Sequence, residues 1–202
     1  MSEEFQDPPR TIKELFQFYS CRVKPIYAEI EASNNLLPVE LLFEVFAAFD
    51  HLKRFYVDDV PEKDAVRSTF SHLKRGLLDA FKLKLKNYNA DYDGLLKDAR
   101  LFALIDNGEF TRTLQDNRKM IIQAGKQARL SESNSDIKQA FEHWEKTSLL
   151  IDTFYDQFFG SEKLLWAKTF EKNQSREEQI KNAGICLIIG LIVVIITHII
   201  GW

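Results

Sequence analysis

The chain has 202 residues, of which 45% are hydrophobic and 28% are charged, and its net charge is −3. This composition is typical of a folded globular protein and excludes a strongly basic surface that binds nucleic acid without local patches. The two cysteines, Cys21 and Cys186, lack the paired spacing of a metal site, so we expect no metal and no cofactor, and they fit a reducing cytoplasm. Glycine and proline are scarce and stand where helices would end, which predicts an all-α fold.

The first expected helix runs from Thr11 to about Ala32. Thr11 and Glu14, three residues later, are typical of a capping box, and the apolar residues that follow recur at helical spacing. Pro25 lies inside this helix, and a proline lacks the backbone N–H that a helix interior needs. We therefore expect a kink or a split near it.

The next two expected helices are rich in aromatic residues. The second covers residues 38–57, and its apolar residues are too many for one stripe, so we expect it to be central. The third begins after Asp58-Asp59 and Pro61, a typical helix start, and ends at the turn-type residues 87–89. Most of the 16 phenylalanines in the chain are expected to be buried.

We expect a helix over residues 91–130, with a break or kink at Asp106-Asn107-Gly108. Residues 131–135 are expected to form a polar loop. The last residue of that loop, Ser135, is expected to cap a helix over residues 136–159. Together these patterns predict a multi-helix bundle over residues 1–160.

After Gly160 the chain changes character. Residues 161–182 are polar and predict either a helix that runs into the last segment or a short tether. Residues 183–202 contain no Asp, Glu, Lys or Arg, and as a helix they would be about 30 Å long, which matches the hydrocarbon core of a bilayer. We therefore expect a single C-terminal transmembrane helix that acts as a tail anchor.

The charges beside this segment predict its orientation. Basic residues precede the expected span and none follows it, so the positive-inside rule places the bundle in the cytoplasm, at what we expect to be a bacterial inner membrane. These residues are Lys163, Lys168, Lys172, Arg176 and Lys181.

Small residues recur along one side of the expected span. Ala183, Gly190 and Thr197 are seven residues apart, and Cys186 lies on the same side. We call these four residues the small-residue seam. Because small residues let helices approach closely, the seam favours a homo-oligomer, although glycine and threonine are common in transmembrane helices in any case.

A short motif in the third expected helix suggests chemistry. Arg67 and His72 form the pattern Arg-x4-His, and the string Phe-x-His-Leu-Lys-Arg occurs both at 49–54 and at 70–75. Residues 40–86 resemble the HEPN-like proteins of prokaryotic antiviral defence, whose ribonucleases carry Arg-x4-6-His near a helix start. With its membrane span, the chain is similar to the membrane-anchored HEPN-like accessory proteins of type VI-B CRISPR systems, which form oligomeric pores and depolarise the membrane.

The resemblance implies roles for individual residues. His72 would be the general acid/base of a metal-independent endoribonuclease and Arg67 would hold the scissile phosphate, with His51 and Arg75 in support. In this family two protomers form one composite cleft. The structural alternative is that both histidines are half-buried polar positions and that Arg67 pairs with Asp64.

Several lysines follow the motif along the same helix. They could contact RNA or anionic headgroups, or they could form an ordinary solvated face. They are Lys74, Lys82, Lys84 and Lys86.

These patterns leave three functional hypotheses. The first is an oligomeric effector or accessory of antiviral defence that perturbs the membrane, with a defence-system protein or RNA as a further partner. The second is the membrane-tethered endoribonuclease, and the third is a non-catalytic membrane scaffold. Other catalytic motifs, such as a phosphate loop, GxSxG or HExxH, are absent from the sequence.

Overall fold

The computed structural model describes residues 8–34, 38–103 and 105–200. All regular secondary structure in these ranges is helical, which confirms the all-α fold. The chain forms two compact units. The first contains Met1–Asp93 and Lys119–Asp152, and the second contains Gly94–Arg118 and Thr153–Trp202.

The first helical segment consists of α1 (Ile12–Phe18), a π-helical turn η1 (Tyr19–Val23) and α2 (Lys24–Asn34). The Glu14 N–H donates to the Thr11 hydroxyl at 3.2 Å, so the predicted N-cap is confirmed. In η1 the Lys24 N–H donates to the Tyr19 carbonyl, five residues back. Pro25 cannot donate a hydrogen bond, and the wider π turn directly before it absorbs the disruption that the sequence predicted.

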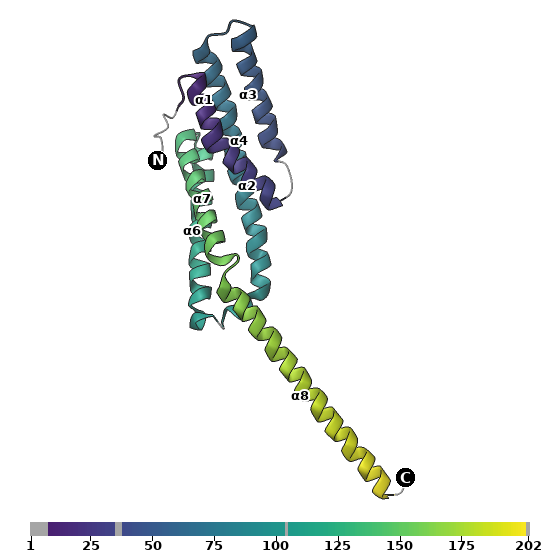
Figure 1. Ribbon diagram of the computed structural model, residues 1–202. Coiled ribbons are helices and arrows are strands. Elements are labelled where there is room, and N and C mark those ends of the chain that lie inside the picture. The colour runs from purple at the N-terminus through teal and green to yellow at the C-terminus, as the bar shows by residue number, and fades with distance from the viewer. Residues whose placement is uncertain (1–7, 35–37, 104, 201–202) are drawn as a thin grey trace. The chain divides into compact units, whose positions relative to one another are not determined.

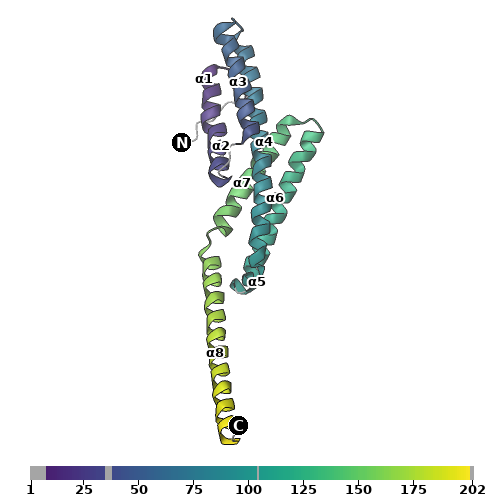
Figure 2. The ribbon, with the colours of Figure 1, turned by 90° about the vertical axis from the view of Figure 1, so that its right-hand side faces the viewer.

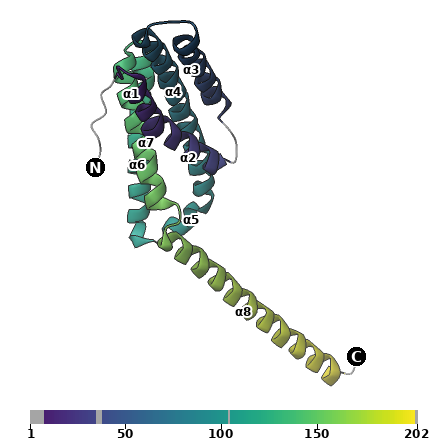
Figure 3. The same ribbon diagram turned by 45° about the horizontal axis from the view of Figure 1, so that its top comes forward.

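Helices α3 (Val39–Val57) and α4 (Glu62–Leu95) lie side by side (Figures 1 and 3). They meet at Gly76, where an added Cβ would lie 2.5 Å from Leu41 Cδ1. The expectation that α3 is central was wrong, because only one of its faces is buried. The fully buried residues of α3 are Leu41, Ala48 and Leu52.

Helix α4 continues through residues 87–89, where the sequence predicted its end. Tyr88 and Tyr92 are buried, and their ring centroids are 6.1 Å apart. Burial of these two rings favours continued helix, and tertiary packing overrides the weak turn preference of the flanking asparagines.

Helices α6 (Glu109–Ser133) and α7 (Ile137–Phe158) contribute Ile121 and Trp144 to the core of the first unit. Their connection is shorter than predicted. Ser131 is a buried residue of α6, and Asp136, rather than Ser135, caps α7 by accepting a hydrogen bond from the Gln139 N–H at 3.0 Å.

In the second unit, a short 3-10 turn η2 (Leu96–Asp98) leads into α5 (Ala99–Phe102), and the turn η3 (Asp106–Gly108) precedes α6. The predicted break at η3 is confirmed, since Asp106, Asn107 and Gly108 all have positive φ angles. The core of this unit is aromatic, and the rings of Phe102 and Phe158 each lie 5.3 Å from that of Phe110.

The last helix, α8 (Glu162–Ile200), is drawn as one continuous helix in Figures 1 and 2. Residues 162–182 therefore form a helix that runs into the apolar segment, and not a tether. Ion pairs hold the start of α8 within its unit, including Lys168 with Asp98 at 2.6 Å and Arg100 with Glu171 at 2.8 Å.

Within the described residues, α8 is the one helix with the length and composition to cross a membrane. Its apolar window has a mean hydropathy of 1.8, and none of that window is buried by the rest of the protein. An apolar helix of this length with no protein cover is what a bilayer can accommodate.

Candidate functional site

Two histidines face each other where α3 packs on α4. The repeated Phe-x-His-Leu-Lys-Arg strings place His51 on α3 and His72 on α4, and their Nε2 atoms are 3.2 Å apart. Their ring centroids are 5.0 Å apart, with an interplanar angle of 32°. The structure thus brings together two of the residues that the sequence singled out.

A carboxylate orients one of these rings. Glu44 Oε2 lies 2.7 Å from His72 Nδ1, and both side chains are largely shielded from solvent. Donation from Nδ1–H to the carboxylate leaves the lone pair of His72 on Nε2, which faces His51. Sequence reasoning missed Glu44, although its position seven residues before His51 puts both on the same side of α3.

Arg75 covers the outer side of this pair. Its Nη2 atom lies 3.2 Å from His72 Nε2 and 2.9 Å from His72 Nδ1, and its Nε is 3.7 Å from Glu44 Oε2. When Nδ1–H donates to Glu44, only Nε2 can accept a hydrogen bond, so Arg75 and His51 share one acceptor. We call Glu44, His51, His72 and Arg75 the histidine cluster.

The surroundings favour the neutral form of His51. Burial lowers its pKa from the usual 6.5, and His72 and Arg54 lower it further, against a smaller opposing effect of Asp50. A neutral imidazole can accept a proton at pH 7, which is the property that a general base requires.

Arg67 lies outside the histidine cluster. It forms an ion pair with Asp64 at 3.3 Å, and its side chain is 78% exposed. Arg67 is five positions before His72, a step of about 140° around a helix, whereas Arg75 is three positions after His72 and lies on the same side. The guanidinium beside His72 is therefore that of Arg75, and Arg67 takes the alternative ion-pair role.

The predicted lysines do not form one basic strip. Lys84 is 4% exposed and pairs with Asp152 and, at 2.6 Å, with Glu29. Lys74 Nζ lies 4.7 Å from the ring centroid of Phe141 in a cation–π contact. Their partners are distant in the sequence, so the pattern of lysines alone could not reveal them.

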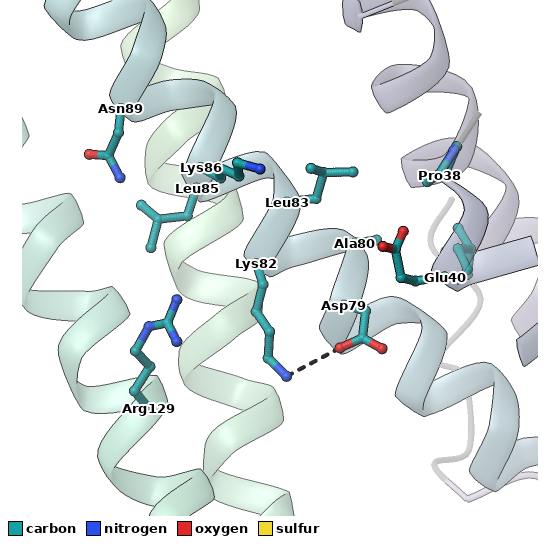
Figure 4. A pocket seen from close by; sticks show the side chains of 11 residues that line it. Pro38, Glu40, Asp79, Ala80, Lys82, Leu83, Leu85, Lys86, Asn89 and Arg129 are labelled. Atoms are coloured by element: carbon teal, nitrogen blue, oxygen red, sulfur yellow. Dashed lines mark hydrogen bonds and ion pairs between the residues drawn. The ribbon is translucent and has the colours of Figure 1, made fainter. Parts of the chain in front are cut away.

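Lys82 and Lys86 line a cavity of about 520 Å³ at α3, α4 and α6, shown in Figure 4. Lys82 pairs with Asp79 at 3.2 Å and with Glu132 at 2.9 Å. Burial lowers the pKa of Lys82, but hydrogen bonds and charge from Glu132 and Asp79 outweigh burial and raise it above 10.5. Because Lys82 is already paired and acidic residues share the lining, this cavity does not select one sign of ligand.

The described residues hold no group of metal ligands, and the chain matches no known protein in three comparisons. Among the described residues, no three His, Cys, Asp or Glu side chains gather as a group that could hold a metal ion. Comparisons with protein-family models, with curated proteins and with solved structures found no match to this chain.

Proposed function

We propose that this chain is a membrane protein, anchored by α8, that self-associates and acts as an effector or accessory in prokaryotic antiviral defence by perturbing the membrane. The proposal is supported chiefly by the apolar window of α8, none of which is buried by the rest of the protein. Burial of an apolar segment of this length in lipid is strongly favourable, because each buried CH2 contributes about 0.8 kcal/mol.

The polar first half of α8 supports an orientation. Lys172, Arg176 and Lys181 are exposed and precede the apolar residues along the same continuous helix. Positively charged residues beside a span remain on the cytoplasmic side. The bundle would therefore face the cytoplasm, where a defence-system protein or RNA could reach it.

The small-residue seam supports self-association within the membrane. Ala183, Cys186 and Gly190 are described, and the side chain of Thr197 lies outside the described residues. No heavy atom lies within 4 Å of a Cβ placed on Gly190. The backbone at Gly190 is thus open to close approach by an identical helix.

A pair of glycine variants tests this proposal. Gly190→Leu places a bulky side chain on the seam, whereas Gly184→Leu makes the same change about 120° away around α8. We expect Gly190→Leu to reduce the oligomer size of the detergent-extracted protein and the dye release from vesicles. Gly184→Leu should change neither. Equal behaviour of both variants and the original chain would contradict assembly through the seam.

The histidine cluster favours a second candidate, a membrane-tethered, metal-independent endoribonuclease. One imidazole would remove the proton of an RNA 2′-hydroxyl as that oxygen attacks phosphorus, and the other would protonate the departing 5′-oxygen. Glu44 would orient His72, and Arg75 would hold the phosphate. His51→Ala and His72→Ala should each abolish RNA cleavage, whereas Arg67→Ala should retain it. Loss of cleavage in Arg67→Ala alone would refute this assignment.

A further inference from the structure

Helix α3 carries an apolar face opposite the one that it buries. Six residues follow one another at alternating steps of four and three, the heptad spacing of helices that pair. They are Val39, Phe43, Phe46, Asp50, Lys53 and Val57. The four apolar members are 50–67% exposed, and we call these six residues the α3 outer face.

Further aromatic residues extend this face. Phe49 and Tyr56 are exposed on the adjoining side of α3, and Phe16 of α1, which Figure 2 shows beside α3, lines a small cavity together with Phe49. The five aromatic residues of this patch are 49–67% exposed, so at about 200 Å² for each aromatic side chain they leave roughly 600 Å² of apolar surface in contact with solvent. That area lies at the upper end of the largest patch of a typical monomer and is about three quarters of one partner's share of a standard interface.

We propose that the α3 outer face binds the same face of a second copy of this chain, with the two α3 helices antiparallel. The proposal rests on the self-association proposed above and assigns it a surface outside the membrane. The surface is self-complementary, as a two-fold interface requires.

The charged residues in the middle of the α3 outer face determine whether the two α3 helices pack parallel or antiparallel. Parallel, in-register helices would place Asp50 against Asp50 and Lys53 against Lys53, and like charges at such positions oppose pairing. Antiparallel helices can set Asp50 opposite the partner's Lys53, twice about the two-fold axis. The same register sets Phe46 opposite the partner's Val57, so the two α3 helices overlap over residues 46–57.

The ion pairs that Asp50 and Lys53 form within the chain do not prevent them from pairing with a second copy. Asp50 contacts Arg54 at 3.2 Å and Lys53 contacts Asp58 at 3.7 Å, and all four side chains are exposed. Exposed pairs of this kind contribute about 0–1 kcal/mol, so they can be replaced.

The charge pattern also favours a protein partner over a lipid surface. Helices that lie on anionic membranes carry lysine and arginine along their polar side. The α3 helix instead has Glu40 and Asp50 among its exposed residues, and Lys53 is already close to Asp58. The membrane anchor helps pairing, because it confines copies to one surface and raises their effective concentration.

The test is charge exchange in the full-length chain, measured by analytical ultracentrifugation in detergent. Asp50→Lys and Lys53→Asp should each weaken association by about tenfold, because each creates like-charge contacts across the two-fold axis. The double variant Asp50→Lys/Lys53→Asp should restore it. Failure of the double variant to recover would overturn the antiparallel arrangement.

An apolar substitution with a matched control tests the surface itself. Phe46→Glu should abolish pairing, whereas Leu149→Glu, a change at a comparably exposed residue of α7, should not. Equal association of both variants with the original chain would overturn the α3 outer face as an interface.

Two outcomes separate this inference from the proposed function. If oligomers persist in every α3 variant but are lost in Gly190→Leu, the α3 pairing is wrong and assembly through α8 stands. If association follows the α3 charges but alkaline carbonate removes the chain from vesicles, the α3 pairing stands and the membrane function is wrong.

Discussion

His51 and His72 approach each other through their Nε2 atoms, 3.2 Å apart, so the two rings can share only one proton along that line. A second proton on that line would make His72 an imidazolium and would set two N–H groups against each other within a partly desolvated site. The Glu44 carboxylate, 2.7 Å from His72 Nδ1, determines which ring is the better donor. The two histidines therefore differ in their ability to donate a proton. General acid–base chemistry needs such a difference, because one group must accept a proton and the other must donate one.

The lowered pKa of His51 predicts that the folded protein loses stability in mild acid. As pH falls through about 6.5, the unfolded chain binds a proton that folded His51 does not, so the contribution of His51 to stability is complete above that value. It is lost as pH falls further toward the lowered pKa. Urea unfolding between pH 7.5 and 5 should show a smaller loss of stability in His51→Gln than in the original chain.

The matched control for this experiment is His143→Gln, because His143 is a half-buried histidine on α7. If His51→Gln and His143→Gln lose stability equally between pH 7.5 and 5, the His51 explanation is incorrect.

We expect alanine to have opposite effects on stability at two glycines of α4. At Gly76 a Cβ would collide with Leu41 Cδ1, so Gly76→Ala should destabilise the protein by about 1–3 kcal/mol despite its better helix propensity. At Gly94 nothing lies within 4 Å, and Gly94→Ala should stabilise by about 0.5–1 kcal/mol. Thermal unfolding measures both. Stabilisation by Gly76→Ala would show that α3 and α4 are less tightly packed there.

We expect Lys84 to stabilise the fold rather than to bind a ligand. Lys84→Ala removes the cation between Glu29 and Asp152 and should cost about 1–3 kcal/mol. This is less than for a fully buried pair, because both carboxylates keep contact with water. Lys86→Ala, at an exposed position on the same helix, should change stability by less than about 0.5 kcal/mol. Chemical denaturation of the two variants compares them directly, and equal stabilities would argue against the ion-pair role.

Much of the fold follows from local signals. The cap at Thr11 and the break at Asp106-Asn107-Gly108 depend on residues next to one another in the chain, and both were predicted. The continuation of α4 past Tyr88 was not, because it depends on rings buried by packing. The expectation of a central α3 was wrong because apolar count does not reveal whether a second face is covered by the same chain.

The histidine cluster was predictable only in part. The repeated string pointed to His51, His72 and Arg75, since it places a histidine and an arginine three residues apart on one side of each helix. The partner of His72, Glu44, becomes apparent only when α3 packs on α4. For Arg67, the sequence left a catalytic role and an ion pair with Asp64 open, and the structure shows the ion pair.

Alkaline carbonate extraction of vesicles that contain the full chain tests most directly whether α8 anchors this protein in a membrane. Peripheral proteins are released by this treatment, whereas a helix buried in hydrocarbon is retained. We predict that the chain stays in the vesicle pellet, and that replacing Ile188, Ile192 and Ile195 by aspartate moves it to the supernatant. Release of the unaltered chain would contradict the proposed membrane function.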